Sequence, residues 1–393
     1  MIVLKKIVLS VIILSGLYSQ NIYDVIRPFW GFNHSQIISN SIGGATVASS
    51  YITPGLTSNP ANLAATPFAY FQTNLSNAEF SNNSSNISKT GFNGIDFVQP
   101  IPVYRGSLVL SAGAHKSSDY MFSYQDQTSD YVLDYSEEGR LTSYHIGAGL
   151  EFAQGFYIGA DLKFLKGSDE MMIHYESDST DYYRPKYSGT SLTLGILHTI
   201  SKNIQYGISL DMATSLNVRE KFVYSNHILP ENSYSGESNY KVTKPITLHM
   251  GAAYLSNLLN LFYELEWTDW KSLKYSSDET YNNSSDLPAS VFINQEIQEN
   301  FNQTFSHHVG TAIRVPFFPL HIFAGYQYTP FPEKNGHYGD DVRENYSLGF
   351  SFAVKKNIAI QGSLNTYSWT FAGLNENFNK FSLGVSIYDI PGI

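Results

Sequence analysis

Residues 144–164 read YHIGAGLEFAQGFYIGADLKF, and every second residue is apolar on either side of a turn at Gln154. The residues between them are glycine, polar or charged. Because successive side chains of a β-strand point to opposite faces, this period of two predicts two strands, each with one apolar face. The stretch therefore predicts an antiparallel hairpin whose two faces meet different surroundings.

The same alternation returns from Phe68 onward and predicts about fourteen strands. They cover residues 68–80, 92–101, 106–126, 140–153, 155–165, 187–200, 203–213, 240–254, 259–270, 305–315, 320–328, 344–354, 357–369 and 379–389. The connections after the even-numbered strands are tight, whereas those after the odd-numbered strands are mostly long and polar, such as 166–186, 214–239, 271–304 and 329–343. A β-sandwich also has alternating strands, but short turns at one end and long loops at the other are typical of outer-membrane barrels. We therefore expect an all-β fold, a transmembrane barrel of about fourteen antiparallel strands over residues 68–393.

The composition narrows the range of partners. Only 15% of the residues are charged, and the formal net charge of -10 argues against nucleic acid, whose recognition calls for basic patches. The 29 Tyr and 25 Phe predict aromatic belts at the two membrane interfaces, and hence contact with outer-membrane lipid. The absence of cysteine excludes disulfides and thiolate metal sites.

The first 67 residues do not belong to the alternating pattern. Lys5 and Lys6 precede an apolar run over 7–17, which predicts a secretory signal peptide over residues 1–19. The alternative, a membrane anchor, needs a run of about 20 residues. Residues 20–67 contain Gly43-Gly44, Pro54-Gly55 and Asn59-Pro60, and we expect them to enter the barrel mouth from the short-turn side as a plug.

Six stretches resemble, in the same order, segments of the FadL family, the outer-membrane long-chain fatty acid and hydrocarbon transporters. They are SIGGATVASS (41–50), SNPANLA (58–64), KPITLHMGAAY (244–254), YELEWTDWKSL (263–273), HHVGTAIRVP (307–316) and LHIFAGYQYTPFPEKN (320–335). The resemblance implies a fourteen-stranded barrel closed on the periplasmic side by an N-terminal hatch. The chain departs from such barrels in ending at Ile393 rather than at an aromatic residue.

The resemblance also implies where gating and exit take place. The hatch motif matches Asn59, Pro60 and Ala61, and Gly43 and Gly44 precede it in the same segment. The family's third strand, whose inward kink opens a lateral path through the wall, corresponds to residues 106–126. Glycine and polar residues inside a strand mark a bend, so we place the kink where the alternation is interrupted, at Gly113, Ala114, His115, Lys116, Ser117 and Ser118.

Several residue pairs invite a chemical interpretation that the pattern does not favour. Glu264 and Glu266 share one strand face, where acid–base chemistry or cation binding is possible, but solvated groups of the lumen are the simpler interpretation. His307 and His308 are neighbours and point to opposite faces, which argues against a metal pair. Asp340-Asp341 is expected to be a solvated loop acid. No nucleophile motif is present, so we expect no catalytic residue, no metal, no cofactor and no enzymatic activity.

Four apolar residues near the predicted loops are candidates for ligand capture: Met121, Phe122, Ile293 and Phe301. Apolar residues between Phe292 and Phe305 recur at helical spacing. A short amphipathic helix could capture a hydrophobic ligand there, or the same residues could pack against the barrel rim.

The sequence therefore predicts a monomeric outer-membrane channel for passive uptake of a small hydrophobic ligand, a long-chain fatty acid or a hydrocarbon, through a hatch-gated barrel with a lateral exit. The alternative is a FadL-like barrel that binds protein partners as a shuttle in type IX secretion. A gap beside the third strand would favour transport, and a broad partner-binding rim would favour the shuttle.

Overall fold

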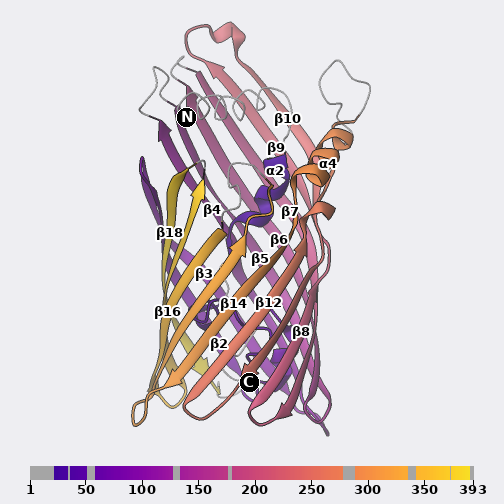
Figure 1. Ribbon diagram of the computed structural model, residues 1–393, viewed down its shortest axis with the longest axis vertical. Helices are drawn as coiled ribbons and strands as arrows, with labels where there is room; N and C mark the ends of the chain where they lie inside the picture. Colours follow the sequence, from indigo (N-terminus) through magenta and orange to yellow (C-terminus); the bar gives the residue numbers. More distant parts are fainter. Residues whose placement is uncertain are drawn as a thin grey trace.

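A computed structural model describes residues 22–33, 36–50, 58–126, 133–175, 179–277, 288–334, 342–371 and 373–389. They form a closed barrel of 14 antiparallel strands (Figure 1). The first and last wall strands close it, with pairing from Tyr70↔Tyr388 to Asn82↔Glu376. The predicted signal peptide, Asp340-Asp341 and the chain end at Ile393 lie outside the described residues.

Three of the wall strands are interrupted and carry two labels each. In chain order the wall consists of β2 (Tyr70–Asn82), β3 (Asn86–Ile101), β4 (Leu108–Asp126), β5 (Leu133–Ala153), β6 (Phe156–Tyr175), β7 (Ser179–Ser201), β8 with β9 (Ile204–Asp211, Thr214–Asn226), β10 with β11 (Tyr234–Lys244, Thr247–Tyr254), β12 with β13 (Leu259–Asp269, Lys274–Ser276), β14 (Gln303–Arg314), β15 (Leu320–Pro330), β16 (Val342–Lys355), β17 (Ile358–Phe371) and β18 (Leu374–Tyr388). Pro245 separates β10 from β11, because proline has no N–H to donate to a ladder. The short helix η3 (Trp270–Ser272) separates β12 from β13, and η2 (Pro230–Asn232) lies between β9 and β10.

The expected fold class and strand order are confirmed, but two predicted long loops are wrong. Residues 166–186 and 214–239 are mostly strand, because β6, β7, β9 and β10 continue far beyond the predicted ends. Figure 1 shows β9 and β10 rising well above the remaining wall. Most of their outward residues at this height are polar or charged, as in the row Lys186, Arg219 and Asn239. The outward face is no longer mainly apolar there while the backbone pairing continues, so a search for strands with an apolar outer face ends them too early.

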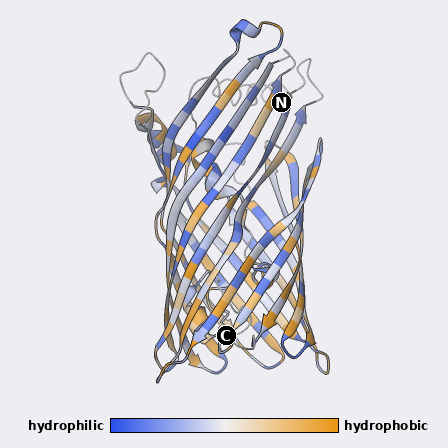
Figure 2. Ribbon diagram, turned by 180° about the vertical axis from the view of Figure 1, so that it is seen from behind, coloured by the Kyte–Doolittle hydropathy of each residue, from blue (hydrophilic) through white to orange (hydrophobic). Residues whose placement is uncertain are grey.

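The outer face of the barrel wall is apolar around its circumference. Ile146 is 62% exposed, Leu75 57% and Leu383 47%, although each belongs to a regular strand. Figure 2 shows hydrophobic segments repeated along neighbouring strands of the wall. Apolar side chains directed outward from a closed barrel face lipid, as in outer-membrane proteins. Among the helices of the described residues, none is long and apolar enough to cross a membrane.

The N-terminal segment lies inside the barrel and reaches further than the mouth. Helix α2 (Ile22–Trp30) packs beside α4 (Ala289–Asn300), which lies in the connection from β13 to β14. The chain then forms β1 (Phe32–Asn33), α3 (Ile37–Ser41) and the 3₁₀ helix η1 (Pro60–Ala65), which contacts β5, β6 and β7 near the short turns. The segment thus descends through the lumen from the long-loop end, instead of entering only from the short-turn side as expected (Figure 1).

Candidate functional site

The candidate site has two parts, the seat of the N-terminal segment in the lumen and an interruption of the wall beside β4. At the seat, Asn59 is fully buried and uses its whole amide group. Its Nδ2 donates to the carbonyl oxygens of Val47 at 2.8 Å and Ile196 at 2.9 Å, and its Oδ1 accepts from the N–H of Ala61 at 3.0 Å. Asn59 therefore caps η1 and ties it both to the rest of the segment and to β7.

Glycines on the lumen face of the wall make room for this segment. An added Cβ at Gly195 would overlap Asn59 Oδ1, and one at Gly207 would overlap the Val47 carbonyl. At six further glycines on β5, β6, β11 and β14–β16 an added Cβ would come within 2.6 Å of the segment: Gly149, Gly159, Gly251, Gly310, Gly325 and Gly349. We call these eight residues the glycine seat. They explain physically why glycine fills so many inward positions of the alternating pattern.

Glu264 fixes the middle of the segment. Its Oε2 accepts from the backbone N–H groups of Thr46 at 2.7 Å and Val47 at 2.8 Å, and its Oε1 accepts from His249 Nδ1 at 2.9 Å. The residue is 1% exposed. The interpretation of Glu264 as a solvated lumen group is therefore wrong, because two orphan N–H groups of the segment are satisfied by this carboxylate. Glu266 does share its face, and lies 3.7 Å from His308 Nε2.

Gly43 and Gly44 lie where the segment meets β14 and β15. Both have positive φ angles, 64° and 79°, and an added Cβ at Gly43 would come within 2.8 Å of the Tyr326 backbone. The Gly43 carbonyl accepts a hydrogen bond from His308 Nδ1 at 2.8 Å. The neighbouring His307 contacts the outward-facing Tyr263 hydroxyl at 2.9 Å. The two histidines thus point to opposite faces, as predicted.

The second part of the site is an interruption in the pairing of β3 with β4. Their ladder runs from Ile101↔Leu108 to Gly94↔His115 and ends there. Beyond it, β3 pairs only with β2, while β4 pairs with β5 and, at Ser118 and Asp119, with β1. The register between β4 and β5 shifts between Lys116 and Ser118. We call the stretch without β3–β4 pairing the unpaired interval. It begins within the residues at which we placed the kink.

The unpaired interval is bounded at its far end by the β2–β3 turn. Asn82 Nδ2 and Ser85 Oγ both donate to the carbonyl oxygen of Ser123 on β4, at 2.8 Å and 2.7 Å. The Gln125 N–H donates to Ser84 Oγ at 3.2 Å. The interval is therefore a stretch without β3–β4 backbone pairing, with the β3–β4 ladder at one end and the hydrogen bonds from the β2–β3 turn to β4 at the other.

An aromatic cluster lies on the lumen side of these strands. It comprises Phe32, Phe80, Met121, Tyr367 and Phe378, with Phe122 and Trp369 packed against it. The Phe32 and Phe378 rings are stacked with centroids 3.6 Å apart. Its members come from β1, β2, β4, β17 and β18, so only the closed barrel assembles this buried apolar cluster beside the interval.

The four candidate capture residues do not form one site. Met121 and Phe122 belong to the aromatic cluster, whereas Ile293 and Phe301 are buried around α2 and α4. The helical interpretation of this region is confirmed by α4. Its apolar residues face Val25 and Ile26 of α2, which favours packing over capture.

Packing and capture by α4 predict different results for Ile293→Ala. Ile293 is fully buried, and truncation of a buried isoleucine costs about 2–5 kcal/mol of stability. We expect a lower thermal unfolding midpoint with unchanged ligand uptake. Val291→Ala is the matched control, because Val291 lies on the same helix and is 48% exposed. A selective loss of uptake in Ile293→Ala, without a change in stability, would support capture instead.

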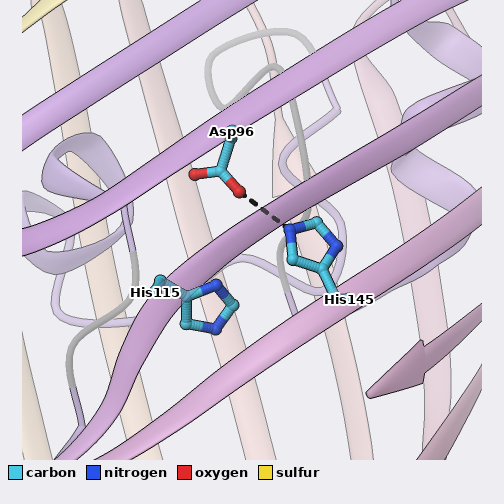
Figure 3. A group of neighbouring side chains, drawn as sticks. All are labelled: Asp96, His115 and His145. Carbon is cyan, nitrogen blue, oxygen red and sulfur yellow. Dashed lines mark hydrogen bonds and ion pairs between the residues drawn. The ribbon is translucent and has the colours of Figure 1, made fainter. Parts of the chain in front are cut away.

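Asp96, His115 and His145 form a further cluster that the sequence pattern did not single out (Figure 3). They come from three neighbouring strands, β3, β4 and β5. His145 Nε2 lies 2.9 Å from Asp96 Oδ1, and its Nδ1 lies 3.4 Å from Asp161 Oδ1. Only the strand register brings these residues together, and no sequence motif with fixed spacing predicts the cluster.

Comparison with known proteins gives a likeness in fold. No family model matches the sequence, and no curated protein matches it. Among solved structures, a FadL homologue of Pseudomonas aeruginosa superimposes with a TM-score of 0.67 at 13% identity, covering 92% of this chain and 100% of that one. The CymD monoaromatic hydrocarbon channel gives 0.62 at 13% identity over 93% and 98% of the two chains. The Pseudomonas putida toluene transporter TodX gives 0.61 at 13% identity over 91% and 98%. The chain therefore has a FadL-like fold, that of an outer-membrane β-barrel.

Proposed function

We propose that the protein is a channel of the bacterial outer membrane for the passive uptake of small hydrophobic molecules, either long-chain fatty acids or hydrocarbons. Residues 20–67 act as the hatch, and the ligand leaves sideways between β3 and β4. The observation that carries this proposal is the unpaired interval, with the aromatic cluster on its lumen side. Three barrels of the same fold, described as a FadL homologue, a hydrocarbon channel and a toluene transporter, support it.

A lateral route suits the chemistry of an apolar ligand. Exposing apolar surface to water costs about 25 cal/mol per Å², so a ligand that crossed a wet axial pore would lose the contacts that attracted it. A ligand that moved from the aromatic cluster through the interval would exchange aromatic contacts directly for lipid. The hatch meanwhile occupies the axial route, held by Asn59, Glu264 and His308.

Deletion of Ser117 tests the lateral route. Ser117 is the extra residue between the pairs Lys116↔Thr142 and Ser118↔Leu141. Without it, β4 can pair regularly with β5 and continue beside β3, which closes the interval. We expect uptake of labelled oleate and toluene into proteoliposomes to fall to the level of protein-free liposomes, while the barrel still migrates as a folded species in semi-native gels.

Ser117→Ala is the control, because it keeps the extra residue and removes only the hydroxyl. Normal uptake by the folded Ser117 deletion would rule out the lateral route. Absence of uptake by the unmodified protein would rule out the channel itself and favour the secretion shuttle.

A further inference from the structure

We propose that Asp96, His115 and His145 bind a divalent transition-metal ion, with Zn²⁺ as the first candidate, in the barrel wall below the unpaired interval. Each residue offers one ligand atom, and these atoms lie within 4.8 Å of one another. Figure 3 shows both imidazoles and the carboxylate directed toward a common region between three strands. The inference concerns metal binding and does not depend on uptake of a hydrophobic ligand.

The strand register explains how the cluster forms. Asp96 pairs with Gly113, and Gly113 pairs with His145, so these three residues make one row across β3, β4 and β5. His115 lies two residues after Gly113 and therefore on the same face of β4. Its partner Gly94 has no side chain that could fill the space beside it.

Gly113 allows two of the ligand atoms to lie close to the backbone of β4. An added Cβ would lie 2.5 Å from His145 Nε2 and 2.6 Å from Asp96 Oδ1. Bonds from Zn²⁺ to imidazole nitrogen and carboxylate oxygen measure about 2.0–2.2 Å. A side chain at position 113 would therefore push these two groups apart, and glycine lets His145 Nε2 and Asp96 Oδ1 lie 2.9 Å from each other. Small side-chain movements would bring both atoms to coordination distance of one ion.

Asp161 on β6 supplies an outer carboxylate. Its Oδ1 lies 3.4 Å from His145 Nδ1, the ring nitrogen that faces away from Asp96. A ligating histidine commonly donates its other N–H to a carboxylate, which fixes the tautomer and raises the basicity of the ligand nitrogen. Asp161 is fully buried and His145 is 2% exposed, so the ring is held firmly in place.

The charges around the cluster also favour a cation. Asp96 and Asp161 bring two carboxylates into a buried region, and Lys163 Nζ, 3.7 Å from Asp161 Oδ2, offsets the charge of the second one only in part. Two nitrogen ligands and one oxygen ligand suit Zn²⁺ and its neighbours in the first transition row better than Mg²⁺ or Ca²⁺. Three protein ligands leave one coordination position for water. His115 is the most exposed of the three.

The alternative is an ion-pair network in which a protonated His145 bridges Asp96 and Asp161 without metal. His115 separates the two cases, because its ring approaches His145 only at a centroid distance of 5.4 Å and has no bond to either carboxylate among the described contacts. A metal site needs His115, whereas the bridging network does not.

The experiment uses the untagged, refolded protein in detergent after removal of metal by chelation. Titration with Co²⁺, followed by its visible absorption, and with Zn²⁺, followed by calorimetry, is expected to give one equivalent bound. His115→Ala is expected to abolish stoichiometric binding without changing the thermal midpoint of the metal-free protein. Asp161→Asn is expected to weaken affinity about 10–100-fold.

His321→Ala is the control, since His321 is an exposed histidine on β15. A lack of one-equivalent binding by the unmodified protein would overturn the proposal. So would binding by His115→Ala with undiminished affinity, because the ion would then lie elsewhere.

Discussion

Replacing Glu264 with alanine is expected to raise the ionic conductance of the barrel in planar bilayers, because residues 20–67, the hatch that we propose, lose their central attachment. The carboxylate accepts from two hatch N–H groups and from His249. Hydrogen bonds to a charged group contribute about 1.5–3 kcal/mol each. A loss of about 3 kcal/mol would raise the unseated fraction of the hatch by about a hundredfold, and water would enter the lumen.

Glu266→Ala is the matched control for this variant. Glu266 lies on the same strand face, but it contacts His308 and His249 and so reaches the hatch backbone only indirectly, through the bond of His308 to Gly43. We expect at most a small rise in conductance. Equal conductance of Glu264→Ala and the unmodified protein would show that the hatch is held by its shape alone.

Gly195→Ala is expected to displace the hatch from the barrel wall by a steric clash rather than by the loss of a hydrogen-bond acceptor. The new Cβ would overlap Asn59 Oδ1 and lie 2.9 Å from Pro60 Cδ. Asn59 must then move, and its hydrogen bonds to Val47 and Ile196 are lost inside the barrel. Because an unsatisfied buried group costs about 1–3 kcal/mol, we expect higher conductance and a lower thermal midpoint from this single methyl group.

The cause can be isolated with a double-variant cycle. Asn59→Ala removes the atom that the new methyl group meets, so the double variant should cost less than the sum of the two single changes. Ile196→Ala is the control for truncation on the same strand, because that side chain faces outward and is 52% exposed. Strict additivity would mean that Gly195 and Asn59 act independently, contrary to the contact described.

The barrel could be predicted from the sequence because the membrane imposes the pattern. Residues 144–164 alternate regularly since lipid contacts one face and the lumen contacts the other. Above the lipid belt the outward residues are mostly polar or charged, and there the prediction failed at residues 166–186 and 214–239. The turn at Gln154 was predictable because the pattern breaks and restarts within the belt.

The candidate site was less predictable because its parts meet only through register. Glu264 contacts Thr46 across 218 residues of sequence, and no local signal connects a carboxylate on β12 with a hatch amide. Asn59 and Pro60 were found because turn chemistry is local. The cluster of Asp96, His115 and His145 was missed since its members lie on three strands, and their alignment depends on the pairing of Asp96 with Gly113.

The pairing of β2 with β18 has a consequence for biogenesis. The first wall strand, β2, can complete its pairing only after the last one, β18, has been synthesised, because the pairing of these two strands closes the barrel. Helix η1 ends at Ala65 and β2 begins at Tyr70, so only a short connection joins the N-terminal segment to the strand that closes the barrel. The open sheet must therefore enclose the N-terminal segment before β2 and β18 pair. If the N-terminal segment were still outside when the barrel closed, it could not enter the lumen between β2 and β18 afterwards.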